Sequence, residues 1–211
     1  MNQTQIIAVR HGETQWNREK RWQGHNDSPL TKKGLDQAKA VANHLAEVQF
    51  SSIYSSDLDR ACKTAEQIYK ISGIKIITDA RLRERNLGIF EGLTKPEMKS
   101  QFPEAFNKYQ NQDPGYAVPK GESIKQCYAR STAFLKEIPE KHPGETIVVV
   151  THGGVLNAYF RFIIGLPLEA PRRYQLFNAS INRFSYTDGH FILNSFGHID
   201  HLNHIESLDD S

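Results

Sequence analysis

The stretch of sequence that decides the fold is Ile6-Ile7-Ala8-Val9-Arg10-His11-Gly12-Glu13-Thr14. Its first four residues form a short apolar run, which is typical of a buried β-strand. Arg10 and His11 therefore stand where a strand ends and a loop begins, the place where ligands bind in open α/β sheets. A guanidinium holds phosphate in a planar, bidentate way, and an imidazole can attack phosphorus. The pair indicates phosphoryl chemistry.

Strands and helices alternate along the rest of the chain. The β-branched run Thr146–Thr151 is typical of a central strand that is buried on both faces of a parallel sheet. Further elements follow from hydrophobic spacing and from turn residues. Strands are predicted over residues 5–9, 52–55 and 75–78, helices over 30–49, 59–72, 123–138 and 155–164, and a β-hairpin over 181–187 and 190–194. We therefore expect an α/β fold with three layers (α/β/α), a mainly parallel central sheet and a C-terminal β-hairpin.

No repeat, low-complexity segment or linker divides the chain, so we expect one domain spanning residues 1–211. Residues 81–121 are rich in proline and glycine, and we expect short helices and loops there that form a lid or specificity segment. Aromatic side chains in this segment either line a substrate pocket or form a satellite core, and the sequence leaves both interpretations open. They are Phe90, Phe102, Phe106, Tyr109 and Tyr116.

Composition narrows the possible partners. Hydrophobic residues make up 38% of the 211 residues and charged residues 24%, which is ordinary for a globular protein. The formal net charge is only +2, so no bulk electrostatic attraction favours nucleic acid or an anionic membrane. Cys62 and Cys127 form no metal-binding or redox motif, and neither a signal peptide nor a membrane-spanning stretch is recognisable. We expect a cytoplasmic protein; its oligomeric state is not readable.

Reactive side chains follow the predicted strands at four sites. The first site is Arg10 with His11, and the other three are Arg60, Glu84 and His152. Each alone has an ordinary explanation, such as an exposed loop residue, a helix cap or a surface charge. If the strands are parallel, however, their carboxyl ends share one edge of the sheet. The side chains then converge and combine a nucleophile, an anion clamp and a proton donor.

At this point the chain resembles the histidine phosphatase superfamily, in its phosphoglycerate mutase-like branch, over nearly its whole length. Any one of the matching motifs is weak evidence, but together and in this order they are highly specific. They are Arg10–Thr14, Trp16-Asn17, Arg21–Gly24, Asp27–Thr31 with Lys33-Gly34, Tyr54–Ala61 with Thr64-Ala65, Leu82–Glu84, Leu87-Gly88, Phe90–Gly92, Gly121–Ser123 and Val150–Gly154.

The resemblance implies a role for each matching position. His11 would be the nucleophile that takes the phosphoryl group, and Glu84 the acid that protonates the leaving oxygen and then the base that activates water. Phosphate would be bound by Arg10, Asn17, Gln23, Gly24, Arg60, Glu84, His152 and Gly153. No metal and no cofactor is implied, and 2,3-bisphosphoglycerate would be needed only by a mutase. The expected partners are small phosphorylated metabolites.

The expected chemistry sets two conditions. His11 must be neutral to attack, so its other ring nitrogen needs an acceptor, for which a backbone carbonyl near Gly12 is a candidate. Glu84 must hold a proton near neutral pH, which a bound phosphate favours. Arg83 and Arg85 would oppose that proton if they pointed at Glu84, so their directions matter.

Three functions fit the same residues. Only Arg85 to Lys120 separates Glu84 from Gly121, which is too short for the long insertion of the bacterial mutases, and Gln23 stands where mutases usually carry a small hydroxyl residue. These departures favour a broad phosphatase over a phosphoglycerate mutase. A non-catalytic phosphate-binding protein is the third alternative, although every catalytic position is filled.

The tail carries further histidines, His198, His201 and His204, with His190 nearby. They are three residues apart, but no cysteine or glutamate joins them at a metal-binding spacing. We interpret them as chance surface residues, with His198 as a possible edge of the active pocket.

Overall fold

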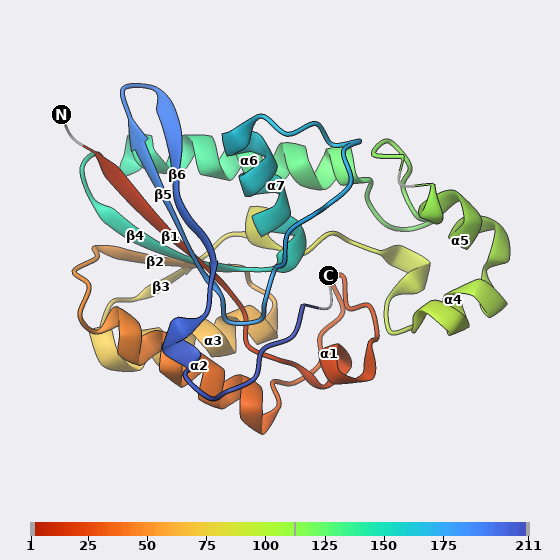
Figure 1. Cartoon of the computed structure of the whole chain (residues 1–211), viewed down its shortest axis with the longest axis horizontal. Coiled ribbons are helices and arrows are strands. Elements are labelled where there is room, and N and C mark those ends of the chain that lie inside the picture. The colour runs from red at the N-terminus through yellow and green to blue at the C-terminus, as the bar shows by residue number, and fades with distance from the viewer. Residues whose placement is uncertain (1–2, 112, 210–211) are drawn as a thin grey trace.

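A mixed β-sheet runs through the middle of the protein, with the strand order β3-β2-β4-β1-β5-β6 (Figure 1). The computed structural model describes residues 3–111 and 113–209. The strands are β1 (Thr4–Arg10), β2 (Ser52–Ser55), β3 (Ile76–Thr78), β4 (Thr146–Thr151), β5 (Ile181–Thr187) and β6 (His190–His198). Strands β1, β2, β3 and β4 run parallel, whereas β5 pairs antiparallel with β1 and β6 antiparallel with β5.

Helices cover both faces of this sheet (Figure 1). Helices α2 (Lys32–Leu45) and α3 (Asp59–Ser72) lie on one face, and α6 (Ile124–Lys141) and α7 (Gly153–Ile164) lie on the other. The α/β class, the three layers, the mainly parallel sheet and the C-terminal hairpin are thereby confirmed.

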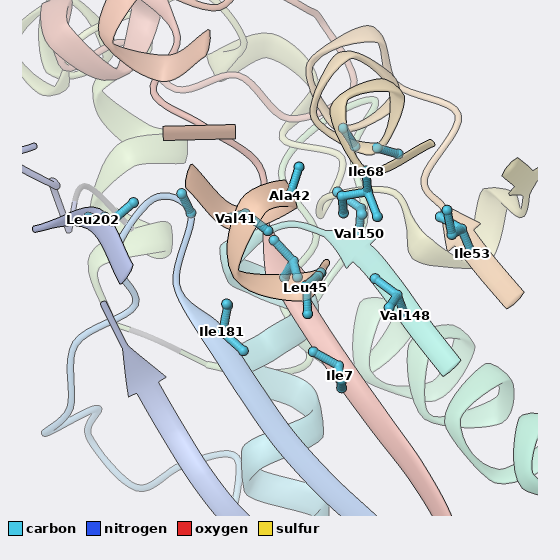
Figure 2. Close-up of a cluster of buried hydrophobic side chains, with 14 residues drawn as sticks. Ile7, Val41, Ala42, Leu45, Ile53, Ile68, Val148, Val150, Ile181 and Leu202 are labelled. Carbon is cyan, nitrogen blue, oxygen red and sulfur yellow. The ribbon is translucent and has the colours of Figure 1, made fainter. Parts of the chain in front are cut away.

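Alternate residues of the central strands fill the two layers of core. Ile7 and Val9 pack toward α2 and α3, in the cluster drawn in Figure 2, whereas Ile6 and Ala8 pack toward α6 and α7. All four are at most 1% exposed. Full burial of one isoleucine or valine side chain stabilises the fold by about 1.5–3 kcal/mol. This burial on both faces explains why the strands read as continuous apolar runs.

The irregular segment carries a small core of its own. Helices α4 (Lys95–Gln101) and α5 (Pro103–Gln110) extend beyond one end of the sheet (Figure 1). Phe90, Met98 and Phe106 are buried there in a cluster separate from the two cores of the sheet. The satellite-core interpretation of these aromatic residues therefore holds for Phe90 and Phe106.

Some element boundaries differ from the expectation. Helix α2 ends at Leu45 rather than near residue 49, because Val48 and Phe50 turn back to pack against the core. Strand β6 continues to His198. A short helix α1 (Gln15–Glu19) was not expected; Thr14 and Asn17 form its capping box. Short 3₁₀ turns lie at Ala80–Leu82, Gly88–Phe90 and Asp200–Leu202.

None of the helices in the described part of the chain is both long and apolar enough to cross a membrane.

Candidate active site

His11 lies directly after β1 and is 2% exposed. Its Nδ1 is 2.8 Å from the carbonyl oxygen of Gly12. Because a carbonyl only accepts hydrogen bonds, Nδ1 carries the proton and the Nε2 lone pair is left for attack. Burial and the charges of Arg60 and Arg10 hold the pKa of His11 well below its usual range. The side chain is therefore neutral near pH 7, as a nucleophile requires.

His152 lies beside His11 because their strands are neighbours. Arg10 pairs with Thr151 in the parallel register of β1 and β4, so the residues that follow both strands emerge together. The two imidazole centroids are 5.1 Å apart. His152 is completely buried, and burial together with the positive charge of Arg60 lowers its pKa well below the usual range.

Arg60, in the first turn of α3, is 1% exposed and held by the loop before α2. Its Nη2 donates to the carbonyl of Gly24 at 2.8 Å, and its Nη1 lies 2.6 Å from the Asp27 carboxylate. Its Nε is buried and has no hydrogen-bond partner among residues 3–111 and 113–209. Buried donors in native proteins almost always have a hydrogen-bond partner, so the Nε–H group of Arg60 is suited to binding an anion.

Arg10 is 3% exposed and donates from Nη1 to the carbonyl of Leu176. The two predicted amide donors are also buried nearby. Asn17 Oδ1 accepts the Thr14 backbone N–H at 2.8 Å, and Gln23 Oε1 is 3.4 Å from the Ser28 hydroxyl.

The two predicted glycine positions could contribute to a phosphate site only through the backbone. Gly24 has φ +55°, in the left-handed region, and a Cβ there would overlap the Glu91 carboxylate. Glu91 accepts the backbone N–H groups of His25 at 2.8 Å and Leu87 at 3.0 Å, so it ties the loop that holds Arg60 to the segment after Glu84. Gly153 is buried and begins α7 directly after His152.

Glu84 is half-buried, and its carboxylate is fixed by backbone donors. Oε1 accepts the Arg85 N–H at 2.7 Å, and Oε2 accepts the Gly154 N–H at 3.0 Å. A Cβ on Gly154 would overlap Oε1 unless the Glu84 side chain shifted, so glycine permits this close approach. The negative charge of Glu84 also opposes the lowering of the Arg60 pKa by burial. Glu84 therefore lies at the same edge of the sheet as Arg60 and the residues after β4.

The arginines beside Glu84 point elsewhere. Arg83 forms an ion pair with Asp57, with Nε 2.7 Å from the carboxylate. Arg85 donates to the Tyr109 hydroxyl at 3.1 Å and lies over that ring. Neither guanidinium pairs with Glu84.

Sequence reasoning missed several supporting residues. Arg130 donates to the carbonyl of Arg83 at 2.7 Å and to that of Glu84 at 2.8 Å, and it also pairs with Glu122. This clamp fixes the acid segment. Asp27 and Ser56 stand inside matching motifs, but their partners come from other elements, and no spacing along the chain reveals such pairs.

Two of the tail histidines contact helix α2, and His201 Nε2 is also 3.0 Å from the carbonyl oxygen of Ala179. His201 and His198 pack around His44 of α2, with ring centroids 5.5 Å and 6.5 Å from His44, and His204 is exposed. Among the described residues, no group of three histidine, cysteine or acidic side chains is arranged to hold a metal ion.

Known proteins resemble this chain along almost its whole length. The family model of the histidine phosphatase superfamily (branch 1) matches residues 6–198. Phosphoglycerate mutase-like protein 4 of Arabidopsis thaliana is 40% identical over 202 residues, which are 94% of this chain and 86% of that protein.

Solved structures of other proteins also superpose on almost the whole of this chain. Bacillus stearothermophilus YhfR superposes with a TM-score of 0.87 and 35% identity, covering 95% of this chain and 100% of that one. A mycobacterial glucosyl-3-phosphoglycerate phosphatase in complex with VO3 gives a TM-score of 0.82 and 32% identity, covering 92% and 98%. With His11, Arg60 and His152 assembled at one edge of a matching fold, the chain belongs to the histidine phosphatase superfamily, whose members are phosphatases or mutases.

Proposed function

We propose that this chain hydrolyses phosphomonoesters of small metabolites through a phosphohistidine on His11. One observation carries the proposal. The hydrogen bond from His11 Nδ1 to the Gly12 carbonyl leaves the Nε2 lone pair free for attack, in a ring whose centroid is 5.1 Å from that of His152 and whose pKa is lowered by burial and by the charge of Arg60. A neutral imidazole among fixed positive donors is what attack on a phosphate ester requires.

The reaction follows from these positions in two steps. His11 Nε2 attacks phosphorus, the bond to the ester oxygen breaks, and Glu84 gives its proton to the leaving alcohol. Water then attacks the phosphohistidine, Glu84 takes the proton of that water, and inorganic phosphate leaves neutral His11 behind. Arg10, Arg60 and His152 stabilise the charge on the phosphoryl oxygens in both transition states. Asn17 and Gln23 add neutral donors, and no metal or cofactor is needed.

Hydrolysis is favoured over phosphoglycerate isomerisation by the short lid. Helices α4 and α5 with their connections fill only Arg85 to Lys120, which leaves little chain to shut water out of the site. A phosphoglycerate mutase is the second candidate, because the Arabidopsis relative carries a mutase-like name. The mutase would keep the phosphoryl group on His11 until a second sugar-acid hydroxyl accepts it.

Turnover of a chromogenic phosphomonoester tests the site. The wild-type protein should release phosphate, before and after treatment with EDTA, and His11→Ala should lose this activity. Full activity in His11→Ala would refute the nucleophile. No activity in the wild type toward any phosphomonoester would favour a phosphate-binding protein.

A second assay distinguishes phosphatase activity from phosphoglycerate mutase activity. 3-Phosphoglycerate is supplied with and without 2,3-bisphosphoglycerate, and the products are measured. Release of inorganic phosphate supports the phosphatase. Rapid conversion to 2-phosphoglycerate that depends on the bisphosphate would establish the mutase instead.

A further inference from the structure

We propose that Ser56 is a positioning residue that fixes the proton of His152 on Nδ1, so that Nδ1–H donates to the phosphoryl group. The inference deepens the proposed function and rests on its assignment of His152 as a phosphate donor. Nothing in the sequence motifs distinguishes Ser56 from its neighbour Ser55.

The fold brings Ser56 to His152. Ser56 follows β2, and its backbone N–H donates to Val150 of β4 at 3.0 Å, so it emerges at the same edge of the sheet as His152. Both side chains are completely buried. Ser56 Oγ lies 2.8 Å from Nε2 of His152, which is hydrogen-bond distance.

The direction of this hydrogen bond follows from the other partner of Ser56. The backbone N–H of Leu58 donates to Ser56 Oγ at 3.3 Å. If His152 Nε2–H also donated to Oγ, the hydroxyl proton of Ser56 would have no acceptor among the described residues. A buried hydroxyl without an acceptor is costly, whereas a hydroxyl that donates to Nε2 satisfies both groups. The hydroxyl therefore donates, and Nε2 accepts.

The proton of neutral His152 must then be on Nδ1. Nδ1 is buried and has no partner within residues 3–111 and 113–209. His152 is the residue before α7, but its side chain makes no capping hydrogen bond to that helix. Among the described residues, Nδ1 of His152 therefore contributes no hydrogen bond to the stability of the fold. It belongs to a ring whose centroid is 5.1 Å from that of the nucleophile His11.

The alternative tautomer would work against the reaction. With the proton on Nε2, Nδ1 would present a lone pair to phosphoryl oxygens, which are acceptors only, and the two would repel. With the proton on Nδ1, the ring adds a donor without adding a charge, within the electrostatic influence of Arg60, whose own Nε–H is also buried without a partner among the described residues. Ser56 thus converts a neutral histidine into a directed donor.

The test determines directly which ring nitrogen of His152 carries the proton. Long-range ¹H–¹⁵N spectra of protein with ¹⁵N-labelled histidine, near neutral pH, assign the protonated nitrogen of His152, identified by its loss in His152→Gln. We expect Nδ1–H in the wild type and in the matched control Ser55→Ala, whose hydroxyl donates to the Ser56 carbonyl and also interacts with Cys62, but does not contact His152 among the described residues. Ser56→Ala should move the proton to Nε2 or give a mixture. Nε2–H in the wild type, or an unchanged tautomer in Ser56→Ala, would overturn the proposal.

Kinetics give a second readout. Ser56→Ala should lower kcat/KM for a chromogenic phosphomonoester by roughly ten-fold and raise the inhibition constant of inorganic phosphate in parallel, because one hydrogen bond to the phosphoryl group is weakened. Ser55→Ala should change neither by more than about two-fold. The wild-type tautomer remains measurable if Ser56→Ala does not fold. Nδ1–H without any turnover in the wild type would refute the proposed function while supporting the assignment of Ser56.

Discussion

The Asp27 carboxylate joins the start of α3 to the buried guanidinium of Arg60. Its Oδ1 is 2.6 Å from Arg60 Nη1, and its Oδ2 accepts the Asp59 backbone N–H at 2.7 Å. Leu58, at the N-cap position of this helix, supplies no side-chain cap. Asp27 therefore caps the helix from another loop and orients a phosphate-binding candidate with the same two oxygens.

The substitution Asp27→Ala should weaken both functions of this carboxylate. The inhibition constant of inorganic phosphate should rise by about ten-fold, since Arg60 loses its orienting partner. The free energy of unfolding should fall by about 1–3 kcal/mol, from the lost cap and the unpaired buried charge. Titration with phosphate and thermal melting measure the two effects.

Asp59→Ala is the control for this prediction. Asp59 is exposed in the first turn of the same helix and carries the same charge. It should reduce stability by less than about 1 kcal/mol through the helix dipole and leave phosphate binding unchanged. If both variants weakened phosphate binding equally, the cause would be the loss of a negative charge near the site. The orientation of Arg60 by Asp27 would then not explain the result.

Glu84→Gln should lower kcat in proportion to how much the leaving group needs a proton. For alkyl phosphates the loss should be about 10²–10⁴-fold, the usual contribution of general acid–base catalysis. For a nitrophenyl ester, whose leaving oxygen is stable without a proton, the first step should suffer less. Glu104→Gln, on the exposed surface of α5, should change neither rate. Equal losses with both esters in the rate of the first step, measured as the burst of alcohol release, would argue that Glu84 does not act as the acid.

The sheet and the convergence of the site were predictable because they depend on local patterns. The apolar runs before Arg10 and His152 indicate strands that are buried on both faces, and parallel strands deliver the residues after them to one edge. The acceptor for His11 was predictable for the same reason, since Gly12 is the next residue in the chain.

Contacts between distant segments were not predictable in the same way. Arg83 turns to Asp57 and Arg85 to Tyr109, and the sequence contains no signal that chooses these partners over Glu84. Asp27 and Ser56 likewise act on residues of other elements. Charged and hydroxyl side chains have many possible partners of similar energy, so the packed fold decides among them.

Acidification should destabilise the protein, and inorganic phosphate should protect it. His11 and His152 have lowered pKa values when folded, chiefly because of burial, whereas in the unfolded chain they titrate near pH 6.5. Below about pH 6.5 the unfolded state therefore binds more protons, so the free energy of unfolding falls as the pH falls. Burial lowers the pKa of His201 to about 4, so its contribution is lost progressively down to that pH.

Melting temperatures between about pH 8 and pH 4 measure this dependence. His201→Gln should make the decline below pH 6.5 less steep, because one group that resists protonation is removed. Phosphate at about one hundred times its dissociation constant should add roughly 2.7 kcal/mol of stability. A melting temperature that stays constant to pH 4 would contradict the burial of neutral histidines.

The lid, which is the segment with α4 and α5 between Arg85 and Lys120, should be able to lose stability without unfolding the sheet. Phe106 is 6% exposed and packs against Phe90, with ring centroids 6.5 Å apart, in a cluster that contains none of the residues of the two sheet cores. Phe106→Ala should remove about 3–5 kcal/mol of packing within the lid. The lid should then be cleaved faster in limited proteolysis, while the far-ultraviolet circular dichroism of the rest of the protein is retained.

The same variant should separate binding of larger substrates from phosphoryl transfer. Turnover of a small chromogenic ester should change little, since none of the residues around His11 belongs to the lid cluster, whereas discrimination among larger phosphate esters should weaken. Tyr69→Ala, which removes an aromatic ring that is 45% exposed on α3, should alter neither proteolysis nor specificity. If Phe106→Ala instead unfolded the sheet cooperatively, the lid would be an integral part of the main core and its packing would not set specificity independently.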